Sequence, residues 1–242
     1  MRHINIPLFI PHRGCPNQCV FCNQRTISGV TAYDPSSFST VIEESLSTLD
    51  SDCDVEIAFF GGSFTGIDRS EMVSLLELAY SYVKDGRVKS IRCSTRPDYI
   101  DSDVLDILEK YGVATVELGL QSTSESVLSL TRRGHGFASE ERAAKMITER
   151  GIALVGQMMV GLPGSSLADE LETADFIIRS GASAARIYPT VVFHDTELCD
   201  MAKRGEYKPL SIDDAIGFTL AVSLLKFSQI NINFTLLPAG IV

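Results

Sequence analysis

The sequence contains no long apolar run and is short of basic residues. No apolar stretch approaches the roughly 18 residues that a membrane-spanning helix needs, and the N-terminal stretch INIPLFIP lacks the length and cleavage pattern of a signal peptide. We therefore expect a cytoplasmic protein with no membrane partner. Lysine and arginine number 21 against 31 aspartate and glutamate, a net charge of -10. Because a protein that neutralises phosphates needs a concentrated basic surface, this balance disfavours a nucleic-acid partner.

Cysteine is also scarce, and half of it is concentrated in one short segment. Three of the 6 cysteines stand singly, without the spacing of a disulfide framework, which favours a reducing compartment and a packing role. These three are Cys53, Cys93 and Cys199. The others fall within GCPNQCVFCNQ, at Cys15, Cys19 and Cys22. Their crowding in one loop sets them apart from ordinary core cysteines.

Short segments rich in β-branched residues alternate with helical patterns along the chain. The expected strands are residues 4–10, 55–60, 88–94, 113–120, 153–160 and 184–190. The expected helices are residues 34–50, 70–83, 102–111, 139–150 and 167–180, with a sixth beginning at Ser211 in the capping-box sequence SIDD. Strands alternating with helices predict a parallel sheet, since right-handed crossovers bring successive strands side by side. The expected fold class is α/β, a partial (β/α)6 TIM-like barrel.

The length and composition predict one domain. At 242 residues and 45% hydrophobic content the chain can bury a sizeable core, and we expect residues 1–242 to form a single unit. The apolar tail is expected to add a further strand, or to begin a C-terminal extension at residues 229–242. In such barrels the functional loops follow the C-terminal ends of the strands, so the cysteine loop after the first strand lies on the active face.

Three closely spaced cysteines suit a metal centre with one open position. Soft thiolate ligands select iron-sulfur clusters, zinc or Cu(I), and three thiolates can hold three irons of a [4Fe-4S] cluster while the fourth iron stays free for an exogenous ligand. The alternatives are a structural zinc site and a chance cluster of core cysteines. A structural zinc site normally has four protein ligands, and only His12 is near enough in sequence to complete one.

The CxxxCxxC spacing, with Phe21 before the last cysteine, resembles the signature of the radical S-adenosylmethionine (SAM) superfamily. The resemblance implies a [4Fe-4S] cluster on Cys15, Cys19 and Cys22 whose fourth iron binds the amino and carboxylate groups of SAM. It also implies one-electron reduction by a partner such as flavodoxin or ferredoxin, and cleavage of the carbon-sulfur bond to a 5'-deoxyadenosyl radical.

Further motifs extend the resemblance and imply the SAM contacts. FFGGSFTG resembles the glycine-rich motif in which Gly61, Gly62 and Ser63 let backbone groups approach the methionine amino group. TVELGLQS followed by LTRRGH resembles the branch that includes the elongator catalytic subunit and oxygen-independent coproporphyrinogen oxidase. By that resemblance Gln121 contacts the ribose and Arg133 pairs with the methionine carboxylate, a group that the planar guanidinium fork suits. Gly161, in GQMMVGLPG, is implied to sit where backbone groups hold the adenine.

The sequence therefore predicts a radical SAM enzyme, without identifying its substrate. Arginines at positions 13, 25, 92 and 96 are expected on the rim of the site, where they would attract a small anionic substrate; the alternative is charge balance by Asp34, Asp98 and Asp101. Two other functions stay open. The elongator-like motifs suggest a tRNA-modifying enzyme, although the elongator subunit has a wider first cysteine gap and an acetyltransferase domain, and a noncatalytic metal-binding scaffold is the other possibility.

Overall fold

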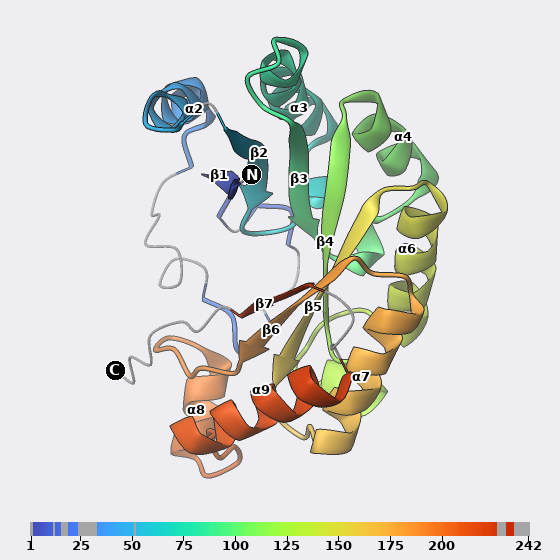
Figure 1. The fold of residues 1–242 in the computed structure, drawn as a ribbon. Helices are drawn as coiled ribbons and strands as arrows, with labels where there is room; N and C mark the ends of the chain where they lie inside the picture. Colours follow the sequence, from blue (N-terminus) through green and yellow to red (C-terminus); the bar gives the residue numbers. More distant parts are fainter. Residues whose placement is uncertain are drawn as a thin grey trace.

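Seven parallel strands form a curved, open sheet with the helices on its outer face (Figure 1). The structure, a computed structural model, describes residues 2–11, 13–15, 19–23, 33–50, 52–226 and 231–234. The strands follow one another in sequence order, with β1 and β7 at the two edges. They are β1 (Arg2–Phe9), β2 (Cys53–Phe60), β3 (Ser90–Thr95), β4 (Val113–Gln121), β5 (Ala153–Val160), β6 (Ala184–Pro189) and β7 (Asn231–Phe234). The predicted partial barrel is confirmed, and β7 pairs with β6 as the extra strand that the apolar tail suggested.

The six expected helices are all present. They are α2 (Phe38–Ser47), α3 (Arg69–Lys84), α4 (Ser102–Lys110), α6 (Phe137–Glu149), α7 (Leu167–Arg179) and α9 (Ile212–Lys226). The predicted cap of α9 is confirmed, since the backbone N–H of Asp214 donates to Ser211 Oγ over 3.1 Å. Two short helices were not predicted, α5 (Glu125–Leu130) and α8 (Glu197–Lys203), because six or seven residues show too little periodicity.

Three 3-10 turns complete the described elements: η1 (Pro35–Ser37), η2 (Phe64–Gly66) and η3 (Pro97–Tyr99). The last two directly follow β2 and β3, on the face that carries the cysteine loop. No helix in the described ranges is both long and apolar enough to cross a membrane.

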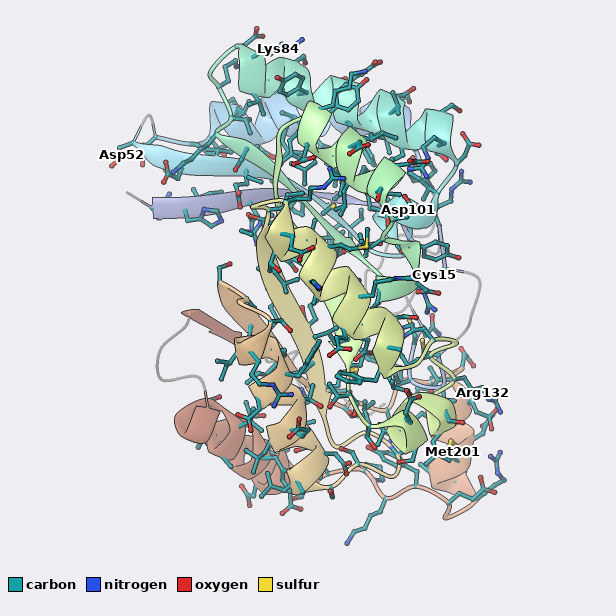
Figure 2. The ribbon with its side chains drawn as sticks, turned by 90° about the vertical axis from the view of Figure 1, so that its right-hand side faces the viewer. Cys15, Asp52, Lys84, Asp101, Arg132 and Met201 are labelled. Atoms are coloured by element: carbon teal, nitrogen blue, oxygen red, sulfur yellow. The ribbon has the colours of Figure 1, made fainter. Side chains whose placement is uncertain are left out.

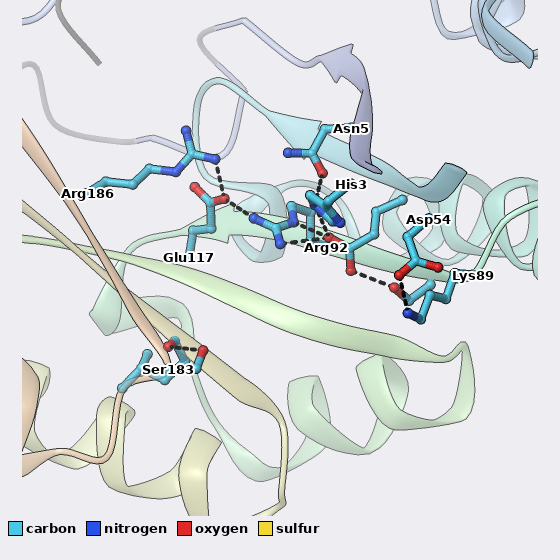
Figure 3. A network of polar contacts seen from close by, with 11 residues as sticks. His3, Asn5, Asp54, Lys89, Arg92, Glu117, Ser183 and Arg186 are labelled. Carbon is cyan, nitrogen blue, oxygen red and sulfur yellow. Dashed lines mark hydrogen bonds and ion pairs between the residues drawn. The ribbon is translucent and has the colours of Figure 1, made fainter. Parts of the chain in front are cut away.

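The two faces of the sheet carry different side chains, as the period of two in a strand requires. Ile57, Phe59, Ile91, Val116 and Leu118 pack with the helices in the main core. The inner face instead carries a charged network (Figure 3). Its members are Glu56, Arg92, Glu117, Gln157 and Arg186, one from each of β2 to β6.

Glu117 is the centre of this inner network. Its carboxylate accepts from Arg92 Nη1 at 2.7 Å, from Arg186 Nη2 at 2.8 Å and from Gln157 Nε2 at 2.8 Å. Barrel interiors of this kind are usually filled with branched apolar side chains. Here paired charges span the middle of the sheet, and the site lies beyond them at the strands' C-terminal ends.

Candidate active site at the C-terminal ends of the strands

The cysteine loop is packed directly against the loop that follows β2. The backbone N–H of Ser63 donates to Arg13 O at 2.9 Å. Gly62 has φ +52, and a Cβ there would lie 2.1 Å from Arg13 O; a Cβ on Gly14, at φ +71, would lie 2.1 Å from Ser63 O. Glycine is required at both positions, because the backbones meet at contact distance in a conformation that side chains disfavour. The glycine-rich motif thus holds the loop that carries the cysteines.

The opposite side of the cysteine loop is held by the loop after α5 and by α8. Val20 donates its N–H to Thr131 O at 3.1 Å and accepts from the N–H of Leu198 at 2.8 Å. Val20 packs with Leu198 and Tyr207 in a small hydrophobic cluster, and the signature aromatic Phe21 packs against that cluster. Cys19 is consequently buried, whereas Cys15 and Cys22 are half-buried.

Arg133 connects the cysteine loop to β4. Its Nη1 donates to Cys19 Sγ at 3.3 Å, and its Nη2 donates to the carbonyl of Gly119. The Arg133 carbonyl accepts from Arg96 Nη2 at 2.7 Å, while Arg96 also forms a two-armed pair with Asp98 at 2.9 and 2.8 Å. Both arginines are buried, at 5% and 3% exposure. The structure therefore places Arg133 beside Cys19, and its pairing with the methionine carboxylate stays a prediction.

Gln121 lies next to the Arg133 guanidinium. It has φ +74, and the pairing of β4 with β5 shifts register between Gly119 and Gln121, an irregularity of the kind that bends a strand locally. A Cβ on Gly119 would lie 3.2 Å from Gln121 Nε2 and 3.6 Å from Arg133 Nη2. The absence of a side chain at Gly119 leaves room for the two predicted SAM ligands to meet above the strand.

Three buried polar atoms in this corner have no hydrogen-bond partner among the described residues. They are Gln121 Oε1, Arg133 Nε and Arg96 Nη1. A buried polar atom without a partner costs about 1–3 kcal/mol, so such a concentration indicates a place for a polar ligand or water. A molecule carrying a carboxylate and hydroxyl groups suits a free guanidinium N–H and a free amide oxygen. These unpartnered atoms therefore fit SAM, which carries both kinds of group.

Burial and nearby charge act in opposite directions on the pKa of the Cys15 thiol. Burial raises the pKa of the Cys15 thiol, and the positive charges of Arg96 and Arg133 act against that rise. Within the described ranges no group of three or more His, Cys, Asp or Glu side chains is placed to hold a metal ion. His12, the only candidate for a fourth zinc ligand, lies outside the described residues.

The predicted contacts of Ser63 and Gly161 remain predictions, because both residues already have partners in the fold. Ser63 Oγ lies 2.8 Å from Thr95 Oγ1 and accepts from the N–H of Arg96 at 3.2 Å, which ties β2 to β3. The N–H of Gly161 donates to Glu170 at 2.7 Å, and its carbonyl accepts from the Tyr207 hydroxyl at 2.7 Å. Gly61 adjoins Ile10 of the cysteine loop, 3.4 Å from where its Cβ would lie.

The expected cationic rim is corrected by the structure. Arg92 does not reach the rim: it is the third residue of β3, points to the inner face, and pairs with Glu56 at 2.6 Å and Glu117 at 2.7 Å. Arg96 is paired with Asp98, as the charge-balance alternative held. Arg13 forms an ion pair with Glu71 and lies over the Tyr33 ring. Residue 25 lies outside the described ranges.

A buried His135–Glu140 pair adjoins this site and was not predicted as a unit. His135 Nδ1 lies 3.7 Å from Glu140 Oε1, with side-chain exposures of 2% and 0%. Burial, reinforced by the charge of Arg133, lowers the pKa of His135 to about 4, and burial raises the pKa of Glu140 well above its usual range. The RRGH motif pointed to His135, but Glu140 sits on a helix face that reads as solvent-exposed in sequence.

Comparison with known proteins identifies the family. The profile of the Radical SAM superfamily matches residues 9–177, more than half of the 242 residues. Uncharacterized protein MJ0486 of Methanocaldococcus jannaschii is 32% identical over 165 residues, which cover 66% of this chain and 50% of that protein. A tRNA uridine(34) acetyltransferase of Methanocaldococcus infernus is 33% identical over 133 residues, 54% of this chain and 25% of that protein.

The fold has solved counterparts. The archaeal Methanocaldococcus infernus Elp3 with an N-terminal deletion superposes with a TM-score of 0.76 at 21% identity, covering 96% of this chain and 56% of that chain. At this identity the likeness shows a shared fold. The chain spans 50% and 25% of the length of the two relatives named above.

Proposed function

Since the chain belongs to the Radical SAM superfamily, we propose that it cleaves SAM reductively at a [4Fe-4S] cluster held by Cys15, Cys19 and Cys22. Proteins of this superfamily bind the cluster and SAM, as the solved neighbours with either group bound illustrate. When bound, the cluster supplies the electron that breaks the carbon-sulfur bond of SAM and releases a 5'-deoxyadenosyl radical. The chain's own residues supply binding, orientation and exclusion of water.

The observation that carries this proposal is the pair of unpartnered atoms, Arg133 Nε and Gln121 Oε1, beside Cys19. Arg133 offers a charge-assisted N–H to the methionine carboxylate, and Gln121 offers an amide oxygen to the ribose hydroxyls. Arg133 is held through Nη1 and Nη2, so its other contacts do not use Nε. The site is thus preorganised, and the binding of SAM does not have to displace an internal partner.

The surrounding residues fix the geometry of the two ligands. Arg96 donates a hydrogen bond to the Arg133 carbonyl, and both carboxylate oxygens of Asp98 accept hydrogen bonds from Arg96. The side chains of the Glu117 network fill the inner face of the sheet. SAM therefore binds at the C-terminal ends of the strands and not deeper inside the barrel. A buried corner of this kind excludes water from a reactive radical.

Anaerobic reconstitution with iron and sulfide tests the proposal and separates an enzyme from a scaffold. We expect about four irons and four sulfides per chain, the composition of one [4Fe-4S] cluster. After chemical reduction with SAM present, we expect 5'-deoxyadenosine. Cluster formation without any 5'-deoxyadenosine would instead support the noncatalytic metal-binding scaffold.

The names of the relatives support a second candidate, modification of tRNA. The matching proteins include a tRNA uridine(34) acetyltransferase and the elongator complex protein 3 of Saccharomyces cerevisiae, 27% identical over 89% of this chain. A net charge of -10 predicts weak binding of tRNA by this chain alone. Filter binding of total tRNA across a salt series decides the point: tight, salt-tolerant binding favours the tRNA function, and weak binding favours a small substrate.

A further inference from the structure

An exposed arginine stands between two residues that hold the cysteine loop. Thr131 accepts from the N–H of Val20 at 3.1 Å, and Arg133 donates to Cys19 Sγ at 3.3 Å. Arg132, between them, is exposed, and in the described part of the chain its side chain has no hydrogen bond or ion pair. Figure 2 shows it at the edge of the molecule, on the same side as Cys15.

Arg132 occupies a backbone position that favours glycine. The N–H of Arg132 donates to Ser129 O at 3.1 Å and the N–H of Arg133 donates to Leu128 O at 3.0 Å, the Schellman pattern that ends α5. Arg132 is its left-handed residue, with φ +54. Glycine is preferred there because a Cβ is strained at positive φ. The conformation of the turn therefore does not explain why position 132 carries an arginine.

Two exposed leucines lie on the same part of the surface. Leu130 directly precedes Thr131 and is 50% exposed, and Leu167, the first residue of α7, is 39% exposed. Leu130 reaches the loop before α7, since its Cδ1 lies 2.6 Å from where a Cβ on Gly164 would stand. Leu130, Arg132 and Leu167, here called the α5 patch, combine exposed apolar side chains with one cation, at positions close in sequence to Thr131 or Gly164.

The geometry points to the α5 patch as the docking surface for an acidic, flavin-carrying electron donor of the flavodoxin type. This inference rests on the proposed function, which requires an external electron. The chain carries a net charge of -10, so an acidic donor is repelled by most of its surface. A local cation and leucines at the turn whose Thr131 holds Val20, the residue after Cys19, are complementary to such a partner. Redox encounter complexes are small, and a patch of this size suits one.

The electron transfer balances without a further reactant. The anionic flavin hydroquinone of the donor gives up one electron and becomes the neutral semiquinone. The electron reduces the oxidised cluster by one unit of charge, and no proton is exchanged. The hydrogen bond between Thr131 and Val20, followed by the backbone of Cys19, connects the α5 patch to a predicted cluster ligand.

Arg132→Gly separates docking from folding. Because glycine suits the left-handed position, this variant should unfold at a melting temperature about 2–4 °C above that of the parent protein. It should nevertheless accept electrons more slowly from flavodoxin hydroquinone. Arg132→Glu should slow the same step by roughly fivefold at low ionic strength, with the difference shrinking at high salt.

The control is a matched charge change at the other end of the sheet. Arg2 is an exposed arginine at the start of β1, so Arg2→Glu alters the net charge equally without touching the α5 patch. The readouts are the dissociation constant of flavodoxin for the cluster-bearing protein and the stopped-flow rate of cluster reduction. Photoreduced deazaflavin, a small reductant that needs no docking, serves as the second electron source.

The outcomes separate the docking surface from the enzymatic function. Weaker flavodoxin binding and slower flavodoxin-driven reduction in Arg132→Glu, with unchanged deazaflavin-driven reduction and an unaffected Arg2→Glu, support the α5 patch. Equal flavodoxin rates in all variants overturn it, as does an equal slowing with both reductants, which would place the effect at the cluster site. Absence of 5'-deoxyadenosine from the parent protein with deazaflavin is instead a failure of the proposed function.

Discussion

The guanidinium of Arg133 donates a hydrogen bond to the sulfur of Cys19 at 3.3 Å, although 114 positions separate the two residues in the sequence. One side chain thereby touches a predicted cluster ligand with Nη1 and keeps Nε free for a substrate carboxylate. The contact joins the predicted metal ligands after β1 to a predicted SAM ligand after α5.

Removing Cys19 should abolish the cluster, whereas removing Cys93 should not. Cys93 is fully buried on the helix-facing side of β3, where it serves as core packing. Cys19→Ala should leave reconstituted protein colourless, and Cys93→Ala should keep the brown absorbance with some loss of thermal stability. Equal loss of colour in both variants would remove the distinction on which the ligand assignment depends.

Replacing Arg133 should weaken SAM binding and spare the cluster. Loss of a charge-assisted contact costs on the order of 2 kcal/mol, so Arg133→Gln should raise the dissociation constant of SAM roughly thirtyfold. The neighbouring Arg132→Gln serves as the control, because Arg132 is exposed and points away from the buried corner. An unchanged SAM affinity in Arg133→Gln, measured by equilibrium dialysis, would falsify the carboxylate assignment.

Gly62→Ala should damage the site far more than Gly86→Ala. Both glycines have positive φ, +52 and +71, so alanine brings about 1–2 kcal/mol of backbone strain at either one. Only Gly62 adds a steric conflict, since its Cβ would lie 2.1 Å from Arg13 O, whereas Gly86 has nothing within 4 Å. Iron content after reconstitution should fall in Gly62→Ala and stay normal in Gly86→Ala. Similar iron content in the two variants would contradict the close loop packing.

Glu170→Gln should stabilise the protein at high pH and have little effect at low pH. Burial raises the pKa of Glu170 to about 7 from 4.5. The folded state therefore holds this proton more tightly than the unfolded state, and the associated stability, present below pH 4.5, is lost as the pH rises through about 7. The glutamine stays neutral and avoids that loss, which amounts to about 3 kcal/mol at most.

Melting temperatures at pH 5 and pH 8 measure this effect. The gap between Glu170→Gln and the parent protein should widen by several degrees toward pH 8. Glu172→Gln, an exposed glutamate on the same helix α7, is the matched control and should show no such widening. A gap that is constant between the two pH values contradicts the raised pKa.

Much of the scaffold could be predicted because its signals are local. Short segments of β-branched residues predicted the strands, and Ser211 with Asp214 predicted the start of α9. The predicted end of the first strand placed the cysteines in a loop. Short α5 and α8 could not be predicted, since a helix of two turns shows no periodicity. They matter nonetheless, because the end of α5 and the start of α8 both hold Val20.

The arginines show where sequence reasoning stopped. Arg92 and Arg96 lie close together in the sequence, yet their side chains have different surroundings. Arg92 points to the inner face of the sheet and pairs with Glu117, whereas Arg96 pairs with Asp98 beside the site. Only the three-dimensional structure shows this difference. The close packing of Gly62 against the cysteine loop was not predicted either, and its expected contact with SAM stays a prediction. The neighbouring atom, Arg13 O, belongs to the backbone of a residue 49 positions away, and sequence patterns do not predict backbone contacts at that separation.

The most direct test of the site is the electron paramagnetic resonance spectrum of the reduced, reconstituted protein with and without SAM. SAM bound at the open iron of a cluster held by Cys15, Cys19 and Cys22 must change the g-values, because the ligand alters the coordination of that iron. We predict a clear spectral change in the parent protein, and the same change in Arg133→Gln only at roughly thirtyfold higher SAM concentration. A spectrum that saturating SAM leaves unchanged in the parent protein would contradict the account.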